Sequence, residues 1–235
     1  MVIEGFSQQM MKREARRNNT VETEIKYRLC SDTSVEDILD NSKITVHMMP
    51  ESRATKRLKN IYYDTNTRDL DKKKAIYRIR EESDGTITAT VKISRSVSDG
   101  LHQRQEWNVE QESEEPDIDY FLRKAESDGD PDKVLTALLG NIKSEQMHEV
   151  CVVEFDRTIV NIGYGDTLIE LACDVGVYRA NRQEEEFFEL ELELLEGNVI
   201  DLMEFGDELE KILDIVPENK SKYEKSIELG NRVKN

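Results

Sequence analysis

The feature that most constrains this chain is the segment at residues 21–29, in which charged and apolar side chains alternate. A later run, at residues 189–194, alternates in the same way. Because successive side chains of a strand point to opposite faces, each segment has one charged face and one apolar face. Several such strands with both charge signs predict a barrel whose charged face points inward, and a charged lumen would be a binding site.

Eight segments show alternation with a period of two, which is typical of half-buried strands. Turn signals such as Ser83-Asp-Gly85 and Gly163-Tyr-Gly165 separate neighbouring segments by short links, as antiparallel hairpins require. Eight strands can close on themselves, so we expect an eight-stranded antiparallel closed β-barrel. The segments lie at about residues 21–29, 60–65, 75–82, 86–94, 102–110, 149–160, 167–174 and 186–195.

Helical spacing of apolar residues occurs in five other segments. The clearest stripe runs from Leu202 through Phe205 and Leu209 to Leu213. We expect these helices to pack on the outside of the barrel, which makes the fold class α+β. The segments lie at residues 34–41, 117–126, 132–142, 199–214 and 220–229.

A length of 235 residues suits one domain of this kind. We predict a single domain over residues 20–235, preceded by a flexible basic extension over residues 1–19. The extension contains Lys12 and Arg13 but lacks the apolar segment of a signal peptide. No run of about 18 apolar residues occurs in the chain, so we expect no membrane span.

The formal net charge of −17 limits the partners that this chain can bind. Such a charge repels nucleic-acid phosphates and anionic lipids, so we expect neither a nucleic acid duplex nor a membrane as partner. Cys30, Cys151 and Cys173 are odd in number and lack paired metal-ligand spacing. They fit a reducing compartment, and we expect a cytoplasmic protein.

Parity within each strand decides which charged side chains share a face. Carboxylate clusters attract hard divalent cations, whereas arginine and lysine contact phosphate oxygens. Buried charges without a ligand are costly to desolvate, so Mg²⁺ with a polyphosphate would satisfy both sets. The groups that share a face are Glu22 with Glu24, Lys26 and Arg28; Arg78 with Arg80; Thr88 with Thr90 and Lys92; Arg104 with Glu106; Glu170 with Asp174; and Glu189 with Glu191 and Glu193.

An ordered series of strings resembles the CYTH superfamily, the triphosphate tunnel metalloenzymes, and especially its bacterial inorganic triphosphatase branch. The resemblance extends over residues 20–230, nearly the whole chain. Each string is ordinary by itself, and the order of all of them carries the resemblance. They are Glu22-x-Glu24-x-Lys26, LKNIYYDTNTRDL at 58–70, YRIR at 77–80, TVK at 90–92, GLHQRQEWNVE at 100–110, EFDRT at 154–158, IELACDVG at 169–176, ELELELLEG at 189–197 and SKYEKSIEL at 221–229.

The resemblance implies an eight-stranded tunnel that uses Mg²⁺ or Mn²⁺ to hydrolyse a small-molecule triphosphate, most simply inorganic tripolyphosphate to pyrophosphate and phosphate. The metal ligands that it implies are Glu22, Glu24, Glu170, Asp174, Glu191 and Glu193. The phosphate-binding residues that it implies are Lys26, Arg78, Arg80, Lys92, Arg104, Arg157 and Lys222. Glu22, Glu24, Lys26 and Lys92 would also act in catalysis. Lys222 resembles a lysine that closes over the substrate in this family.

Two assignments of the resemblance stay open. Glu189, Glu191 and Glu193 offer three candidates where the family pattern commonly needs two, and we select the later pair. Arg157 has the parity of Phe155, so an inward Arg157 requires a β-bulge or a local twist. The three histidines show no ligand spacing, and we assign none of them a catalytic role; they are His47, His102 and His148.

Other functions share the same features. Thiamine triphosphatases and class IV adenylyl cyclases belong to the same superfamily, and the sequence leaves the group beyond the triphosphate open. A non-catalytic polyphosphate or nucleotide sensor is a further alternative, although a pure anion binder has no use for two sets of metal-facing acids. The preferred metal and the oligomeric state, with a homodimer as one possibility, also stay open.

Overall fold

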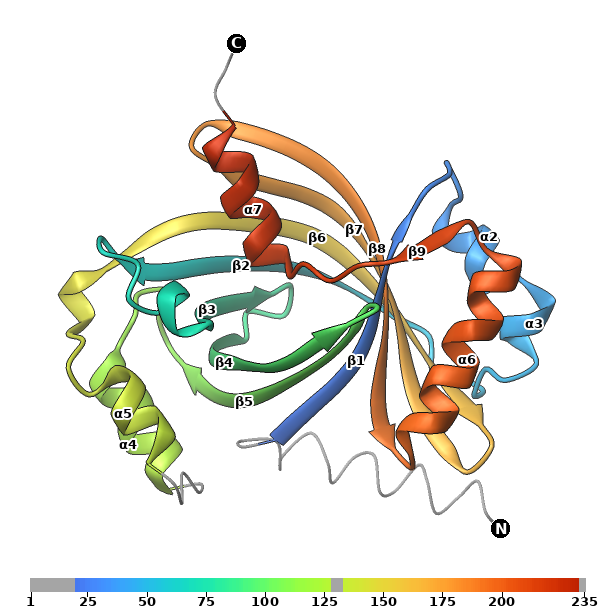
Figure 1. Cartoon of the computed structure of the whole chain (residues 1–235), viewed down its shortest axis with the longest axis horizontal. Helices are drawn as coiled ribbons and strands as arrows, with labels where there is room; N and C mark the ends of the chain where they lie inside the picture. Colours follow the sequence, from blue (N-terminus) through green and yellow to red (C-terminus); the bar gives the residue numbers. More distant parts are fainter. Residues whose placement is uncertain (1–19, 128–132, 233–235) are drawn as a thin grey trace.

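A closed barrel of eight antiparallel strands forms the body of the protein (Figure 1). The computed structural model describes residues 20–127 and 133–232. Around the barrel the strands follow the order β5-β4-β3-β2-β6-β7-β8-β1, and β1 pairs back with β5. This closure confirms the predicted fold class. The strands are β1 (Thr20–Leu29), β2 (Ala54–Thr65), β3 (Ala75–Glu82), β4 (Ile87–Ser98), β5 (Leu101–Gln111), β6 (Met147–Tyr164), β7 (Thr167–Ala180) and β8 (Gln183–Glu196).

Most of the strands are longer than their alternation predicted, whereas β3 has the predicted bounds. β2 begins at Ala54 rather than at residue 60, because its first four residues are exposed and carry no apolar face. A ninth strand, β9 (Ile215–Pro217), was not predicted from the sequence, since three residues are too few for a period to appear. It pairs with β1 at Tyr27–Leu29, beyond the residues that pair with β5.

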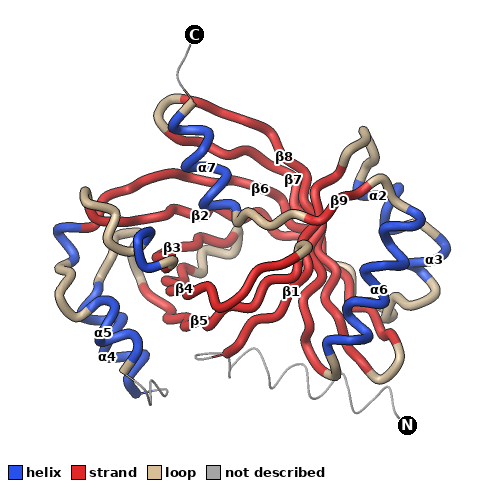
Figure 2. Tube along the Cα trace, in the orientation of Figure 1, coloured by secondary structure: helices blue, strands red, loops and turns tan. Residues whose placement is uncertain are grey.

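Helices pack outside the barrel, as predicted, in three places (Figures 1 and 2). One group lies against the part of the wall that contains β1 and β6 to β8, a hairpin of two helices lies against β2 to β5, and one helix lies across an end. None of the described helices is long and apolar enough to cross a membrane. In the order of these places the helices are α2 (Val35–Leu39), α3 (Ser42–Thr45) and α6 (Val199–Ile212); α4 (Ile118–Ser127) and α5 (Val134–Leu139); and α7 (Lys222–Asn231).

Over most of the barrel the apolar faces of the strands point outward, toward the helices α2 to α6. Trp107 and Tyr77 pack with Phe121 of α4 in one cluster, and Tyr27 and Leu190 pack in a second cluster that includes residues of α2 and α6. Because parity is strict, the neighbouring charged residues of the same strands point into the barrel. The barrel is therefore apolar on its outer surface under the helices and charged inside.

The third apolar cluster lies on the inner face of the wall, where α7 covers one end of the barrel. Tyr223 and Leu229 of α7 pack with Val153 and Phe155 of β6. The inner face of β6 is thus apolar beneath α7 and becomes charged at Arg157.

No β-bulge occurs at Arg157, so of the two alternatives predicted there, a β-bulge or a local twist, the bulge was wrong. The register of β6 with β7 is continuous from Val152 to Tyr164, and the irregularity in the pairing of β6 with β2 lies at Tyr62 and Tyr63. Phe155, an apolar neighbour of Arg157 with the same parity, had suggested that this face of β6 points outward. The face points inward and is apolar at Phe155 because α7 packs on that part of it.

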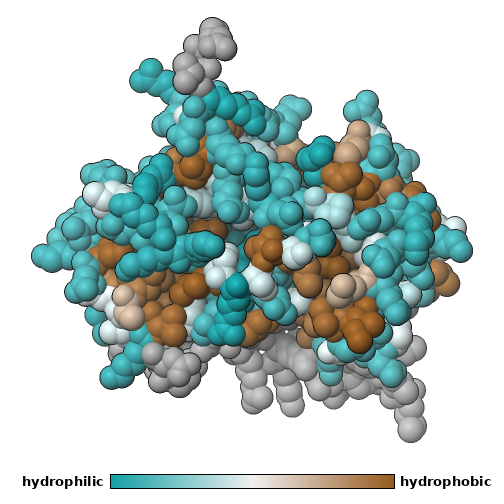
Figure 3. All heavy atoms as spheres, viewed as in Figure 1, coloured by the Kyte–Doolittle hydropathy of each residue, from teal (hydrophilic) through white to brown (hydrophobic). Residues whose placement is uncertain are grey.

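The surface of the side viewed in Figure 1 is mostly hydrophilic, with apolar patches between polar regions (Figure 3). Ile200 and Met203 of α6 are among the exposed large apolar residues. The predicted extension at residues 1–19 lies outside the described residues. The single domain over residues 20–235 and the homodimer stay predictions.

Candidate active site

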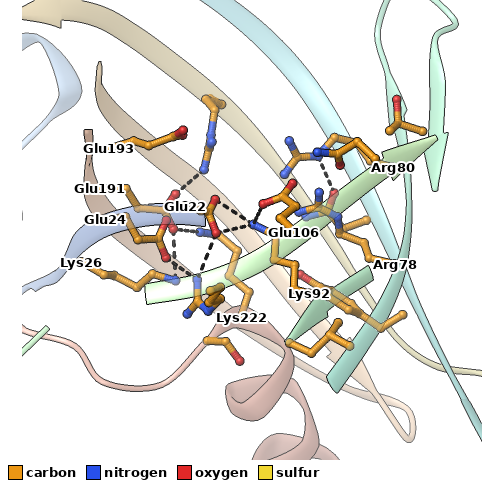
Figure 4. Close-up of a pocket in the computed structure, with 18 of the residues that line it drawn as sticks. Glu22, Glu24, Lys26, Arg78, Arg80, Lys92, Glu106, Glu191, Glu193 and Lys222 are labelled. Atoms are coloured by element: carbon orange, nitrogen blue, oxygen red, sulfur yellow. Dashed lines mark hydrogen bonds and ion pairs between the residues drawn. The ribbon is translucent and has the colours of Figure 1, made fainter. Parts of the chain in front are cut away.

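A cavity of about 310 Å³ occupies the barrel and is lined almost entirely by polar and charged side chains (Figure 4). All eight strands of the barrel contribute, together with the N-terminal end of α7. Every predicted site residue lines this cavity except Asp174. The lining residues are Glu22, Glu24, Lys26, Asn60, Tyr62, Ile76, Arg78, Arg80, Glu82, Thr88, Lys92, Arg104, Glu106, Asn108, Arg157, Glu170, Glu191, Glu193, Ser221 and Lys222.

A row of three carboxylates crosses three neighbouring strands of the cavity wall. Glu24 of β1 lies opposite Glu193 of β8, which lies opposite Glu170 of β7. Side chains directly opposite each other on one face of a sheet are close, and like charges in such pairs are destabilising. The row therefore favours occupation by a cation.

Lys222 enters this acidic side from the first residue of α7. The helix begins there because Ser221 is its N-cap and forms a capping box with Glu224. The Lys222 Nζ atom lies 2.7 Å from carboxylate oxygens of Glu189 and Glu191, and 2.8 Å from Asp174. Burial acts to lower the pKa of Lys222, but these three carboxylates raise it well above its usual range.

Arg157 holds Asp174 in a bidentate ion pair, with distances of 2.7 and 2.6 Å. Arg157 also donates to Glu191, at 2.5 Å. Asp174 is completely buried and is enclosed between Arg157 and Lys222. The structure thus places Asp174 behind the cavity wall, where it anchors two of the predicted phosphate-binding residues.

Of the three glutamates that the sequence left open, Glu191 and Glu193 line the cavity and Glu189 does not. Glu189 is fully buried and accepts a hydrogen bond from the Tyr178 hydroxyl at 2.6 Å. Burial opposes its ionisation, but Lys222 and Lys26 outweigh it and lower the pKa of Glu189 to about 2. Glu189 is therefore an ionised anchor at the α7 end of the acidic side.

A second charged group joins β1, β4 and β5. Lys92 lies 2.8 Å from both Glu22 and Glu106, and Arg104 pairs with Glu24. Burial opposes ionisation of Glu106, but Lys92 and Arg78 lower its pKa to about 2. Glu106 was not among the predicted site residues, although its parity with Arg104 already placed it on the charged face.

Arg78 and Arg80 line the opposite side of the cavity and contact only neutral groups. Arg78 donates to the Thr90 hydroxyl at 3.0 Å, and the Arg80 Nε atom donates to the Asn60 side-chain oxygen at 2.9 Å. Within the described part of the chain, neither arginine forms an ion pair. Enclosure in the wall, with Arg78 and Arg157 nearby, lowers the pKa of Arg80 to about 10.

Two donors on this side have no hydrogen-bond partner among the described residues. They are the Asn60 Nδ2 and Arg78 Nε atoms, both buried. A buried donor without an acceptor is costly, so this side suits a ligand rich in acceptor oxygens. Asn60 was missed as a site residue because an amide has no charge to mark it, although parity places it on the inner face.

The acids of the cavity provide only oxygen donors, the ligand type that Mg²⁺ and Mn²⁺ prefer. In the present side-chain arrangement no group of three or more histidine, cysteine, aspartate or glutamate residues within the described ranges converges as a metal-binding set. The donor chemistry and the register of the carboxylate row fit a hard cation, while lysines and arginines engage several of these acids.

Comparison with known proteins gives concordant matches. The family model of the CYTH domain matches residues 21–227. An inorganic triphosphatase from Haemophilus influenzae is 31% identical over 175 residues, which are 74% of this chain and 46% of that protein. The chain therefore spans about half the length of this curated relative.

Two solved structures have the same fold. A candidate adenylyl cyclase from Hippeastrum, described as having a dominant triphosphatase activity, aligns with a TM-score of 0.59 at 17% identity and covers 90% of this chain and 97% of its own. A protein from Pyrococcus horikoshii aligns with a TM-score of 0.51 at 20% identity, over 88% of this chain and 98% of its own.

Proposed function

This chain belongs to the CYTH domain family, and we propose that it hydrolyses inorganic tripolyphosphate to pyrophosphate and phosphate with Mg²⁺ or Mn²⁺. The observation that carries the proposal is the side of the cavity with Arg78 and Arg80. Two cations that form no direct ion pair within the described part of the chain, beside buried donors without a partner there, favour a polyanion with many acceptor oxygens.

The lining favours an inorganic triphosphate over one with an organic group. Among the lining residues only Tyr62 and Ile76 are apolar or aromatic, whereas binding sites for organic ligands are lined mainly by such side chains. The volume of about 310 Å³ is also at the low end of the range for small-molecule sites. Thiamine triphosphatase and class IV adenylyl cyclase activities are the alternatives within the family.

A divalent cation would be held by the carboxylate row of Glu24, Glu170 and Glu193. When bound, it supplies neutralisation of phosphate charge and lowers the pKa of a water molecule. The role proposed for Arg78 and Arg80 is to bind the phosphoryl oxygens on the opposite side. Lys222, which α7 brings to the cavity, contributes a further point charge. Positioning and charge stabilisation of this kind account for most of the catalysis of phosphoryl transfer.

The test is release of phosphate from tripolyphosphate by the purified protein, with and without Mg²⁺ or Mn²⁺. We expect metal-dependent release that is largely lost in Glu193→Gln and retained in Glu186→Gln, whose side chain is exposed on the same strand. Circular dichroism of both variants checks that each is folded.

A substrate panel separates the alternatives. Thiamine triphosphate and ATP are offered beside tripolyphosphate, and the products are analysed for orthophosphate and cyclic AMP. Preferred turnover of either compound would contradict the inorganic substrate. Tight binding of tripolyphosphate without phosphate release under either metal would assign the chain to the non-catalytic sensor instead.

A further inference from the structure

A strap formed by residues 214–221 links α6 to α7 and passes over one end of β1. Its strand β9 pairs with β1, and the Glu218 amide donates to the Lys26 carbonyl oxygen at 2.8 Å. The Asn219 side chain accepts from the Gly100 amide at 2.8 Å. Gly100 has φ of 78°, and a Cβ there would lie 2.7 Å from the Lys26 carbonyl oxygen of β1 and 3.1 Å from the Pro217 Cβ atom, so the β4–β5 turn lies close against both β1 and the strap.

His102 lies between this strap and the charged cavity. It is 1% exposed and has the same parity on β5 as Arg104, so its ring is on the inner face. Its Nε2 atom lies 2.9 Å from the Glu218 carbonyl oxygen, and its Nδ1 atom lies 2.7 Å from the Arg104 Nη2 atom. The ring therefore contacts the strap with one nitrogen and a cavity arginine with the other.

The two partners fix the protonation of the ring. A carbonyl oxygen can only accept, so Nε2 must carry a hydrogen to bond with Glu218. A guanidinium group can only donate, so Nδ1 must present its lone pair to Arg104. The contacts thus require the neutral imidazole with the hydrogen on Nε2.

Each contact bears on a different part of the proposed site. Arg104 also pairs with Glu24, so an acceptor at Nδ1 fixes the orientation of the guanidinium group from a second side without neutralising its charge. The strap ends at Ser221, the N-cap of α7, and is followed directly by Lys222, the first residue of the helix. A residue that merely filled space would need neither nitrogen.

We propose that His102 is a positioning residue that joins Arg104 to the strap and so couples the phosphate-binding side chains of the barrel to the helix that carries Lys222. The roles of Arg104 and Lys222 toward phosphate rest on the proposed function. The contacts of the His102 ring, and the tautomer that these contacts require, are independent of the proposed function.

Two substitutions separate the contacts. In His102→Asn the side-chain oxygen takes the place of Nδ1 and can still accept from Arg104, but the bond to the strap is lost. In His102→Gln the amide nitrogen takes the place of Nε2 and can still donate to Glu218, but the acceptor for Arg104 is lost. His148→Gln, at an exposed position on β6, is the matched control.

The expected results differ between the variants. The KM for tripolyphosphate rises about tenfold in His102→Gln, the effect of one lost hydrogen bond to a charged group, and much less in His102→Asn. Amide hydrogen exchange of residues 218–229 becomes faster in His102→Asn and stays near the wild-type rate in His102→Gln. Equal effects of the two variants on both readouts would overturn the proposal, since that is the behaviour of a residue needed only for packing.

The tautomer is measured directly by nitrogen-15 NMR of the imidazole rings, with the His102→Asn spectrum assigning the signal. A neutral ring with its hydrogen on Nε2 is expected near neutral pH, and an imidazolium or the other tautomer would overturn the proposal. This spectrum and the exchange rates need no turnover. If tripolyphosphate is not hydrolysed, the proposed function fails while these two measurements still decide the role of His102.

Discussion

The two sides of the cavity differ in how their charges are neutralised. The acidic wall, formed by the inner faces of β7 and β8, holds its buried carboxylates in ion pairs with Lys26, Arg157 and Lys222. The arginine wall, formed by the inner faces of β2 and β3, leaves Arg78 and Arg80 with neutral partners only among the described residues. Asp174, Glu189 and Glu191 are thus paired within the protein, whereas Arg78 and Arg80 form no ion pair among the described residues.

The difference shows which charges serve the fold and which serve a ligand. Removing one partner of a buried ion pair leaves an uncompensated charge, so the acidic wall is part of the stability of the barrel. An enclosed cation that has no counter-charge contributes no such pair and is retained at a desolvation cost. Substitutions on the two walls should therefore affect stability in opposite ways.

The largest loss of stability is expected from Lys222→Met, which keeps the length of the side chain and removes its charge. Three buried carboxylates would lose their shared cation, at a cost of about 3–5 kcal/mol in the free energy of unfolding. Urea denaturation measures this cost.

The matched control is Lys220→Met. Lys220 lies two residues away and pairs with Glu228 at the surface, where both side chains are about half exposed. Its loss should leave the free energy of unfolding nearly unchanged. Similar losses in both variants would mean that the acidic wall does not depend on its buried cation.

The second expectation concerns the loss of stability at acidic pH. The folded-state pKa of Glu189, about 2, lies below its ordinary value of 4.5 because Lys222 and Lys26 outweigh burial. Its contribution, on the order of 3 kcal/mol, is therefore complete above about pH 4.5 and is lost as the pH falls toward 2. Urea midpoints measured between neutral pH and about pH 3 should fall across this window.

Lys222→Met sharpens this test. Without the lysine, the pKa of Glu189 returns toward its ordinary value, so the dependence of stability on pH in this window should become shallower than in the wild type. An equally steep fall in the variant would show that other carboxylates carry the acid sensitivity.

The smallest effect on stability is expected on the arginine wall. Arg80→Met removes an enclosed cation that donates only to Asn60, so the melting temperature should stay the same or rise slightly. The kcat/KM for tripolyphosphate should nevertheless fall about tenfold or more. Arg57→Met, on the outer face of β2, should alter neither quantity appreciably. A marked loss of stability in Arg80→Met would remove the distinction between the walls.

Parity accounts for most of what could be predicted from the sequence. The charged face of β1 with Glu24 and Lys26, and that of β8 with Glu191 and Glu193, follow from alternation alone, because a strand has only two faces. Closure of eight strands followed from their number and from short hairpin turns. Alternation in one strand could not decide whether its charged face pointed to water. The occurrence of both charge signs on several strands indicated an inward face, and the family resemblance implied the same.

The features of the site that could not be predicted depend on contacts between segments that are distant in the sequence. Asp174 has the parity of a cavity residue, but Arg157 and Lys222 enclose it, and no local pattern reports which partners a carboxylate will find. Arg157 was expected to need a β-bulge or a local twist because its neighbour Phe155 is apolar. The sequence could not show that α7, far along the chain, covers that residue on the inner face. His102 lacked ligand spacing, and its role depends on a strap more than a hundred residues away, as its contact with Glu218 shows.

The way β1 closes the barrel has a consequence for the nascent chain. β1 is the first strand of the barrel to be made, yet Glu24 must wait for Glu193 of β8, the last strand of the barrel. A chain made from its N-terminus therefore cannot complete the ring until β8 has emerged. Lys222 is made later still. Until then the cations among the described residues that can pair with Asp174, Glu189 and Glu191 are Lys26 and Arg157, so α7 brings a further positive charge to these carboxylates after all the barrel strands have been made.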